Sequence, residues 1–371
     1  MKLLYIVAKA EYFLSHRLSL AEKAEASGFN IAVATTPFKK GDHRKIIGIK
    51  RFPVKFKRGS LNIFAELKVL FSLYKAFKKF KPSLVHNVAL KPALYGGGIA
   101  RILKIPRVSS INGFGYIFTS NQIKAKLLKP IVKLAIKIIL GDSSSCIMVQ
   151  NQQDYDTCKK LLPKSLVCLV SGSGVSIRNF YPVKHDPKRA FTFALVSRML
   201  WTKGIGEFVE AAKLFKKDNP GSNTRFLLVG EPDFENPESI PVATLKQWNH
   251  EGIVEWLGHV DVMQEIYSIS DVAVLPSYRE GLPKSLLEAM SCGLPIITTD
   301  AIGCRDLVAE GNGIKVPIKN VQALKRAFEQ CEGNKLVCRI MGSKGRELVE
   351  KFYSDDTVNS KIINIYKQVL I

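Results

Sequence analysis

The chain has 371 residues, 46% of them hydrophobic, and its 55 Lys and Arg against 32 Asp and Glu give a net charge of +23. This composition excludes a disordered protein and is sufficient for two domains of ordinary size. No apolar run is long enough to span a membrane, and Leu3–Ala8 is too short for a signal peptide, so we expect a cytosolic protein. The seven cysteines form no C-x-x-C pair, which indicates reduced thiols.

The surplus positive charge lies in the first half of the chain. Residues 1–185 contain 32 Lys and Arg and 8 Asp and Glu, a net charge of +24, whereas residues 186–371 contain 23 and 24, a net charge of −1. Nucleic acid, anionic lipid and phosphorylated substrates are all attracted by such a charge, and charge alone does not choose among them.

Predicted strands alternate with predicted helices along the whole chain, and long segments of helical period occupy Leu61–Phe80 and Ile123–Leu140. The strands expected in the first half are Leu3–Ala8, Asn30–Thr35, Leu84–Val88, Val108–Ile111, Cys146–Val149 and Leu166–Ser171. Those expected in the second half are Phe191–Ser197, Phe226–Gly230, Val254–Leu257, Val272–Leu275 and Ile296–Thr299.

This alternation predicts an α/β protein with two doubly wound parallel sheets. We expect one domain at 1–180 and a second at 181–354, with a C-terminal helix at about 355–371 packing back on the first domain. The glycine- and serine-rich segment 172–176 and the polar stretch after it form the expected hinge. The cleft between two such domains is the expected ligand site.

The most informative motif lies between two of the predicted strands. Glu280-Gly281-Leu282-Pro283 precedes an apolar-faced helix that carries Glu288. A helix N-terminus presents unpaired N–H groups to a diphosphate, and a glycine lets the backbone approach it closely. Glu280 could accept hydrogen bonds from sugar hydroxyls and Glu288 from ribose hydroxyls, so the motif predicts a nucleotide-sugar site. The alternative is an amphipathic helix with two solvated glutamates.

Two cations follow an earlier strand of the second domain. Arg198 comes directly after the strand that ends at Ser197, and Lys203 stands at the start of a helical segment. Both are expected at the same sheet edge as Glu280, because parallel strands end together. They could hold the two phosphates of a leaving nucleoside diphosphate. The alternative is that both are ordinary surface charges.

The histidines are less informative. His16 is expected near the first strand-to-helix turn, and His86 beside the buried pair Leu84-Val85. Either could act on an acceptor hydroxyl, but a structural or positioning role is the favoured alternative. No group of residues has zinc spacing, and neither a P-loop nor a G-x-G-x-x-G motif occurs. Gly96-Gly97-Gly98 lies within a predicted helix, where it favours close packing over phosphate binding.

The segment at 123–140 alternates basic and aliphatic residues. Its cationic side chains, with Leu and Ile expected on the other faces, are Lys126, Lys129, Lys133 and Lys137. Such a helix can lie on an anionic membrane surface; the alternative is a core helix with a solvated lysine edge. A second basic segment with interleaved aromatic residues, Leu67–Lys81, favours membrane association.

Taken together, these motifs resemble those of GT-B glycosyltransferases of family 4. The matching segments span both domains and include Glu280-x7-Glu288, Arg198 with Lys203-Gly204, Trp256-Leu257-Gly258-His259, Ser171-Gly172-Ser173-Gly174-Val175 and Gly303-Cys304-Arg305-Asp306. The segments at 85–92, 112–115 and 275–281 further resemble bacterial enzymes that add N-acetylgalactosamine or a related hexose to a sugar on undecaprenyl diphosphate, in O-antigen, capsule or protein-glycan assembly.

The resemblance implies a retaining transfer from a UDP-sugar that needs no metal or other cofactor. Glu280 would contact the donor sugar, with Gly281, Leu282 and Pro283 beside it, and Glu288 would contact the ribose. Arg198 and Lys203 would bind the diphosphate, and the backbone around Gly258 and His259 would meet the base.

The acceptor implied by the resemblance is a sugar on a polyprenyl diphosphate, and the enzyme would lie at the inner face of the cell membrane. The acceptor-side candidates are His16, His86, Asn112 and Gly113. The family often has a glycine pair where this chain has Ala10-Glu11-Tyr12, and a histidine where it has Asn112-Gly113. Two other functions compete with this one: a basic nucleic-acid-binding protein, which no recognition motif supports, and a hydrolase or phosphorylase on the same fold.

Overall fold

The computed structural model describes residues 1–39, 41–42, 46–56, 62–111, 123–183, 189–309 and 311–371, with the backbone alone over 123–128. The chain forms two compact units. The first contains residues 1–173 together with 355–371, and the second contains residues 174–354.

The first unit is built on a seven-stranded parallel sheet in the order β3-β2-β1-β4-β5-β6-β7. Its strands are β1 (Lys2–Val7), β2 (Asn30–Thr35), β3 (Lys50–Pro53), β4 (Leu84–Val88), β5 (Arg107–Ser110), β6 (Ser145–Val149) and β7 (Leu166–Leu169). Strand β3 was not expected from the sequence. It is an edge strand whose residues are largely exposed, so it lacks the apolar run that identifies a buried strand.

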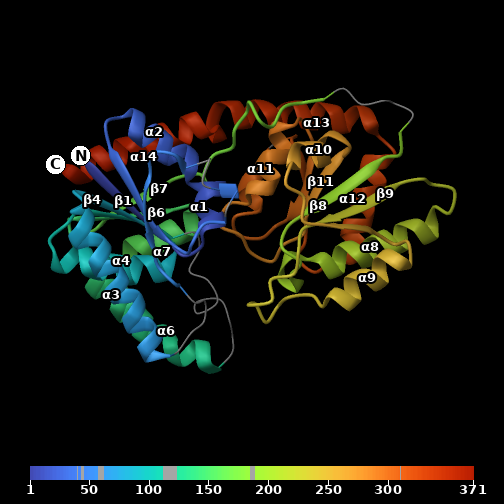
Figure 1. Cartoon of the computed structure of the whole chain (residues 1–371). Helices are drawn as coiled ribbons and strands as arrows, with labels where there is room; N and C mark the ends of the chain where they lie inside the picture. The colour runs from blue at the N-terminus through green and yellow to red at the C-terminus, as the bar shows by residue number, and fades with distance from the viewer. Residues whose placement is uncertain (40, 43–45, 57–61, 112–122, 184–188, 310) are drawn as a thin grey trace. The chain divides into compact units, whose positions relative to one another are not determined.

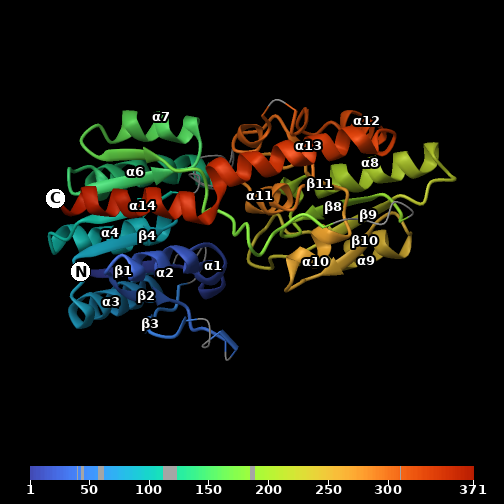
Figure 2. The same cartoon turned by 90° about the horizontal axis from the view of Figure 1, so that it is seen from above.

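Helices cover both faces of this sheet (Figures 1 and 2). One face packs against α1 (Ala10–His16), α2 (Leu18–Ala26) and α14 (Asp355–Leu370). The other packs against α3 (Ile63–Phe80), α4 (Leu90–Ile102), α6 (Ile123–Leu140) and α7 (Gln152–Leu161). The C-terminal helix α14 packs in the core of this unit through buried residues such as Ile362 and Tyr366, and the Tyr366 hydroxyl lies 3.1 Å from that of Tyr5.

Two of the three glycines of α4, Gly96 and Gly97, allow close packing, as the sequence predicted. A Cβ atom on Gly96 would lie 2.2 Å from the Asn87 side chain on β4, and one on Gly97 would lie 3.0 Å from Leu140 of α6. The first contact is too short for a methyl group and the second is tight, so glycine lets α4 lie close to both the sheet and its neighbouring helix.

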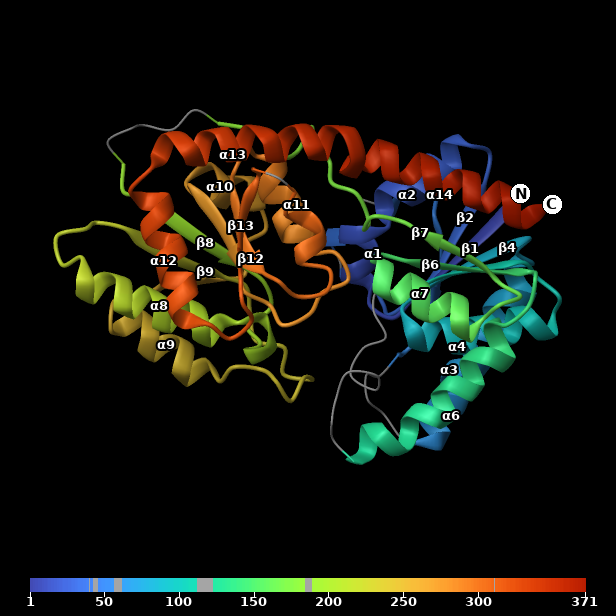
Figure 3. The same cartoon turned by 180° about the vertical axis from the view of Figure 1, so that it is seen from behind.

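The second unit contains a six-stranded parallel sheet in the order β10-β9-β8-β11-β12-β13. Figure 3 labels β8, β9, β12 and β13 of this sheet. Its strands are β8 (Thr192–Val196), β9 (Arg225–Val229), β10 (Glu255–Gly258), β11 (Val272–Leu275), β12 (Ile296–Thr299) and β13 (Gly313–Val316). Its helices include α8 (Ile205–Asp218), α9 (Val242–His250), α10 (Met263–Ser268), α11 (Lys284–Ser291), α12 (Val321–Glu332) and α13 (Lys335–Leu348). Strand β13, again at an edge and short, was also not expected.

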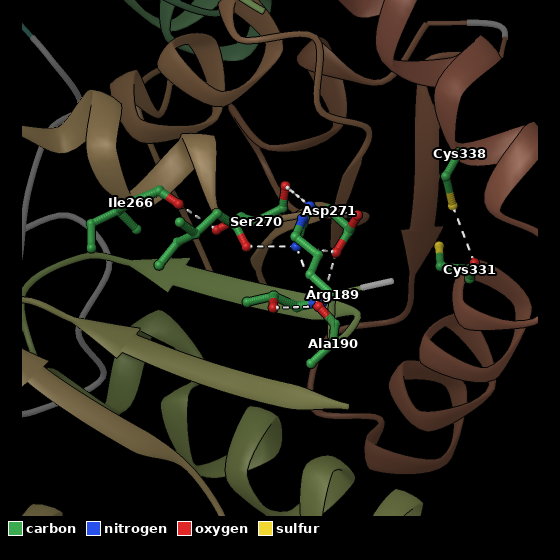
Figure 4. A network of polar contacts seen from close by, with 9 residues as sticks. Arg189, Ala190, Ile266, Ser270, Asp271, Cys331 and Cys338 are labelled. Atoms are coloured by element: carbon green, nitrogen blue, oxygen red, sulfur yellow. Dashed lines mark hydrogen bonds and ion pairs between the residues drawn. The ribbon is translucent and has the colours of Figure 1, made fainter. Parts of the chain in front are cut away.

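A polar clamp joins the two central strands of this sheet at their amino ends (Figure 4). The Arg189 guanidinium donates to both carboxylate oxygens of Asp271, at 2.9 and 2.8 Å, and the Asp271 carboxylate also accepts from the Thr192 N–H. The Cys338 thiol contacts the Cys331 carbonyl oxygen at 3.3 Å and links α13 to α12. The Arg189–Asp271 pair therefore lies at the edge of the sheet opposite to the carboxyl ends of β8 and β11.

No helix among the described residues is both long and apolar enough to cross a membrane.

Candidate active site

The candidate site of the second unit lies where the strand order reverses. The chain runs from β8 outward to β9 on one side, whereas β11 lies on the other side of β8. Ligands of open α/β sheets bind at the carboxyl ends of the strands at such a reversal point. Arg198 and Lys203 follow β8, and Glu280 follows β11, so the structure places all three at this edge.

Lys203 and Glu280 form an ion pair between Nζ and Oε1. Both side chains are mostly enclosed, with 17% and 14% of their surface exposed. A charge pair in this partly desolvated position interacts more strongly than a fully exposed surface pair. The sequence placed both residues at one sheet edge, and the structure brings them into contact.

The backbone around Lys203 explains this contact. Trp201–Lys203 forms a single 3-10 turn that ends at Gly204, whose φ is 73°. A Cβ atom on Gly204 would lie 2.1 Å from the Pro276 carbonyl oxygen. The Thr202 carbonyl accepts a 3.0 Å hydrogen bond from the Tyr278 N–H. The turn after β8 is therefore fastened to the segment after β11, which carries Glu280.

A third loop fixes Glu280 from the other side. The Glu280 N–H donates to the Ile302 carbonyl at 2.9 Å, in the loop that follows β12. The next residue, Gly303, has a φ of 78°, and a Cβ atom there would lie 2.4 Å from the Glu280 carbonyl oxygen. Sequence reasoning missed this supporting role of Ile302 and Gly303.

Arg198 is held by a carboxylate that the sequence did not single out. It forms an ion pair with Asp233, which follows β9. Arg198 is 48% exposed, whereas Asp233 is only 9% exposed, so the mostly enclosed acid anchors the accessible cation. The position of Asp233 just after a predicted strand was the available signal, because it places the residue at the same sheet edge.

Helix α11 begins at Lys284, after Pro283 at its cap position. Its first backbone N–H groups have no partner within the helix, as at any helix N-terminus. Gly281 and Leu282 lie in the turn that leads into it, and Leu282 packs partly against the core of this unit. The turn and the helix N-terminus predicted from the sequence are therefore both present.

Glu288 lies within α11 and is largely buried. Burial raises the pKa of its carboxyl, while the Lys284 ammonium at 3.6 Å and the Tyr267 hydroxyl at 3.4 Å act in the opposite direction. Tyr267 also donates to the Ser285 carbonyl at 2.9 Å. Glu288 is thus positioned by two neighbours and is not one of the solvated glutamates of the alternative interpretation.

Gly258 and His259 lie at the end of β10, separated from β8 by β9. Gly258 has a φ of 64°, and its carbonyl accepts from the Gly230 N–H at 2.7 Å. His259 is exposed, with Nε2 at 3.2 Å from Asp261. Both lie at the carboxyl edge that carries Lys203, two strands away from it.

The first unit holds the acceptor-side candidates. His16 lies at the C-terminal end of α1 and not at the turn before it; its ring stacks on Tyr12, with 4.1 Å between the ring centres. Its Nδ1 lies 2.7 Å from the Ser15 hydroxyl. Asn112 and Gly113 lie outside the described residues.

His86 is fully buried in the middle of β4. Its Nδ1 lies 2.6 Å from the Tyr366 hydroxyl and its Nε2 lies 2.7 Å from the Ser110 hydroxyl. Burial, with the neighbouring Arg17 adding to it, lowers the pKa of His86 well below its usual range. Both ring nitrogens are thus engaged by protein groups, an arrangement that favours the structural role over contact with an acceptor.

The predicted membrane-facing helix, α6, differs from expectation in one respect. Lys133 and Lys137 are exposed as predicted, whereas the side chain of Lys126 is outside the described set. Ile131, Leu134 and Ile138 are also exposed, beside the lysines, and the core contacts come from other residues such as Ile136 and Leu140. Its outward face is therefore both cationic and apolar, which the simple lysine stripe did not predict.

No cluster of three or more His, Cys, Asp or Glu side chains that could hold a metal ion occurs within the described ranges.

Two family models match the chain, one for each unit. The model described as "Glycosyl transferase 4-like" matches residues 2–151, and the model described as "Glycosyl transferases group 1" matches residues 190–334. The chain belongs to the family 4 glycosyltransferases. The segments at 198–204 and 280–288 that form the candidate site both lie within the second match.

Curated relatives of this glycosyltransferase agree with that assignment. It is 27% identical over 340 residues to N,N'-diacetylbacillosaminyl-diphospho-undecaprenol alpha-1,3-N-acetylgalactosaminyltransferase of Campylobacter jejuni, covering 87% of each chain. It is also 27% identical over 325 residues to UDP-Gal:alpha-D-GlcNAc-diphosphoundecaprenol alpha-1,3-galactosyltransferase of Escherichia coli, covering 84% of this chain and 82% of the relative.

Solved structures show that the glycosyltransferase has the GT-B fold. Sucrose-phosphate synthase from Thermosynechococcus elongatus superposes with a TM-score of 0.81 at 19% identity, covering 100% of this chain and 99% of that one. Anabaena Alr3699/HepE in complex with UDP and glucose superposes with a TM-score of 0.78 at 17% identity, covering 99% of both chains.

Proposed function

We propose that this glycosyltransferase moves a sugar, with N-acetylgalactosamine as the best candidate, from a UDP-sugar to a sugar carried on undecaprenyl diphosphate. The names of the two relatives support this acceptor, because both describe transfer to a sugar linked to diphosphoundecaprenol. The product would enter the assembly of a surface polysaccharide or related glycan. The transfer is proposed to retain the configuration of the donor sugar and to need no metal ion.

The observation that carries the proposal is the contact between Lys203 and Glu280 at the reversal point of the sheet. When the bond between the sugar and UDP breaks, the diphosphate keeps the bonding electrons and its negative charge grows. A cation already in place for that charge lowers the barrier without reorganisation. Arg198, paired with the mostly enclosed Asp233, supplies a second cation at the same edge.

Binding of the donor would change the partner of Lys203. A diphosphate at the N-terminus of α11 competes with Glu280 for the ammonium group, since it carries more negative charge than one carboxylate. Glu280 then becomes available to accept hydrogen bonds from the donor-sugar hydroxyls. Glu288, within α11, would accept hydrogen bonds from the ribose hydroxyls, and the backbone at Gly258 and His259 would contact the base.

The acceptor end of the reaction is assigned to the first unit. Its net positive charge suits a lipid diphosphate, and the lysines exposed on α6 suit an anionic membrane surface. We therefore propose peripheral association with the inner face of the cell membrane. Nothing in the described site favours nucleic acid as the partner.

The proposal is tested by incubating the purified chain with individual UDP-sugars and an undecaprenyl-diphosphate-linked sugar, and detecting products by mass spectrometry. We expect one added hexose or N-acetylhexosamine with one donor, and loss of product in the Lys203→Ala variant. Release of free sugar without transfer would indicate a hydrolase. Transfer to inorganic phosphate would indicate a phosphorylase. Binding of duplex DNA with a steep salt dependence and no UDP binding would support the nucleic-acid alternative instead.

A further inference from the structure

The outward face of α3 carries an unusual concentration of large apolar side chains. We use the name α3 ridge for Phe64, Leu67, Phe71 and Tyr74, which are 78%, 54%, 59% and 42% exposed. These positions recur every three or four residues and so form one stripe on the helix. The opposite stripe, which includes Leu73 and Phe77, packs in the core of the first unit.

The charges around the α3 ridge have a single sign. Lys68, Lys75, Lys78 and Lys79 are all exposed on the same helix. Its one acidic residue, Glu66, is turned toward α4, where it forms an ion pair with Lys91 at 2.8 Å and accepts from the Tyr95 hydroxyl at 2.7 Å. The exposed side chains of α3 itself are therefore apolar, phenolic or cationic.

Two of these lysines lie over the aromatic rings of the ridge. Lys75 Nζ lies 4.4 Å from the ring centre of Phe71, and Lys78 Nζ lies 5.5 Å from that of Tyr74. Long cationic side chains that cover apolar groups while keeping their charge in water are suited to a boundary between an apolar and an aqueous phase. Aromatic residues with lysines at their margin are typical of helices that lie in that boundary.

Helix α6, in the same layer, has a similar outward face. It lies on the same side of the sheet as α3, and α4 packs against both (Figures 1 and 3). Its exposed Ile131, Leu134 and Ile138 stand beside Lys133 and Lys137. The same combination of apolar and cationic side chains thus occurs on two helices of one layer.

We propose that the α3 ridge inserts into the interfacial region of an anionic lipid bilayer, with its lysines at the level of the headgroups. The inference rests on the proposed function, in which the acceptor is anchored in a membrane, and it names the surface that enters the lipid. Charge complementarity selects an anionic bilayer as the occupant, because the surface combines exposed apolar area with exposed lysines.

The first test measures binding of the full-length chain to vesicles made of equal parts phosphatidylcholine and phosphatidylglycerol. The triple variant Phe64→Ser, Leu67→Ser, Phe71→Ser should bind roughly 1000-fold more weakly, because each large apolar side chain withdrawn from water contributes about tenfold. The matched control, Ile47→Ser, Leu336→Ser, Ile340→Ser, removes three apolar side chains that are also exposed but lie elsewhere, Ile47 in a turn and the other two on α13. It should bind like the wild type.

A second measurement reports insertion directly. Phe64→Trp adds one emitter to the native tryptophans, and lipids brominated in their acyl chains should quench the added fluorescence. Ile47→Trp, the matched control, should show no quenching. These single exposed substitutions also test the inference if the triple variant does not fold.

Three results would overturn the inference. The first is vesicle binding of the triple variant that equals that of its control. The second is loss of all wild-type binding at high salt, which would show that binding is purely electrostatic. Alternatively, ultracentrifugation could show a wild-type dimer that the triple variant loses, with no vesicle binding by either protein, which would assign the ridge to a second copy.

The proposed function is tested separately from membrane insertion. With a short-chain polyprenyl-diphosphate-linked sugar that is dissolved in water, the triple variant should transfer at the wild-type rate. If the wild type transfers to no polyprenyl-linked sugar while the ridge still governs vesicle binding, the proposed function fails and the membrane surface stands.

Discussion

A Cβ atom on Gly204 would lie 2.1 Å from the carbonyl oxygen of Pro276, although 72 positions separate the two residues in the chain. This close approach fixes the turn that carries Lys203 against the segment that carries Glu280. The position of the ion pair therefore depends on a residue with no side chain.

Substituting Gly204 by Ala should displace this turn and reduce transferase activity by roughly 100-fold, because a small misplacement of a charge-stabilising group has a large effect on rate. Gly252→Ala is the control. Gly252 also has a positive φ, of 66°, but a Cβ atom added there would meet nothing within 4 Å. This variant should lose stability through backbone strain and keep its activity per folded molecule, measured by initial rates and thermal unfolding. Equal activity losses in the two variants would argue against the packing role.

Removing either site cation should affect the chemical step more than donor binding, since the leaving-group charge is largest in the transition state. For Arg198→Ala and Lys203→Ala we expect kcat to fall on the order of 10²–10³-fold, comparable to losing one preorganised donor of an oxyanion hole. The matched control is Arg225→Ala. Arg225 also pairs with a carboxylate, that of Glu255, but at the start of β9, on the opposite edge of the sheet. Activity of both site variants within threefold of wild type would exclude them from the mechanism.

Chelation of metal ions should leave the rate nearly unchanged, because Arg198 and Lys203 would neutralise the diphosphate in place of a divalent cation. The measurement is the initial rate with and without EDTA after removal of metal from the substrates. Strong inhibition that magnesium reverses would contradict the proposal of a metal-independent transfer.

The stability of the first unit should fall as the solution is acidified, because of His86. Burial lowers the pKa of His86 well below its usual range, whereas the unfolded chain takes up the proton near pH 6.5. Below that pH the unfolded state binds more protons than the folded state, so stability is lost as the pH falls toward the lowered value. The contribution of His86 to the slope of the unfolding free energy against pH reaches up to about 1.4 kcal/mol per pH unit.

This slope is measured by urea unfolding at several pH values. His86→Gln should be less stable at neutral pH. Below pH 6.5 its free energy of unfolding should no longer show the part of the pH dependence that His86 contributes. His16→Gln, which removes a half-buried histidine from the same unit, should keep it. An identical pH dependence in wild type and His86→Gln would disprove the assignment.

The lysines of α6 should contribute to membrane binding in a salt-dependent way. Changing Lys126, Lys129, Lys133 and Lys137 to Gln should release the chain from acidic vesicles, since each is expected to contribute about 1 kcal/mol. The control changes four exposed lysines of the second unit to Gln: Lys213, Lys217, Lys246 and Lys351. Both variants should titrate UDP like the wild type. Binding is measured by cosedimentation with the vesicles. Unchanged cosedimentation of the α6 variant would refute the role of this helix in membrane binding, and loss of UDP binding would show that the helix had been wrongly assigned.

Much of the fold could be predicted because the buried strands of a parallel sheet are short apolar runs between helices. Thr192–Val196 and Val272–Leu275 are buried almost throughout, and both were expected within a residue of their ends. The short edge strands Lys50–Pro53 and Gly313–Val316 were not found, since exposure at an edge relaxes the demand for apolar residues.

The candidate site was predictable as a set of residues at one edge but not as a set of contacts. The sequence places Arg198 after one strand and Glu280 after another, and strand adjacency brings those ends together. The anchoring of Arg198 by Asp233, and the support of Glu280 by Ile302, depend on loop conformations that no local pattern encodes. The burial of His86 was likewise hidden, because Tyr366, which contacts it, lies 280 residues further along the chain.

The return of α14 to the first unit has a consequence for protein synthesis. The Tyr366 hydroxyl meets groups that leave the ribosome at the very start of translation, those of Tyr5 and His86. Residues 174–354 are made in between and form a unit of their own. The half of the enzyme that is translated first is therefore the one completed last, and a chain released before residue 355 would expose the buried face of its first sheet to chaperones and proteases.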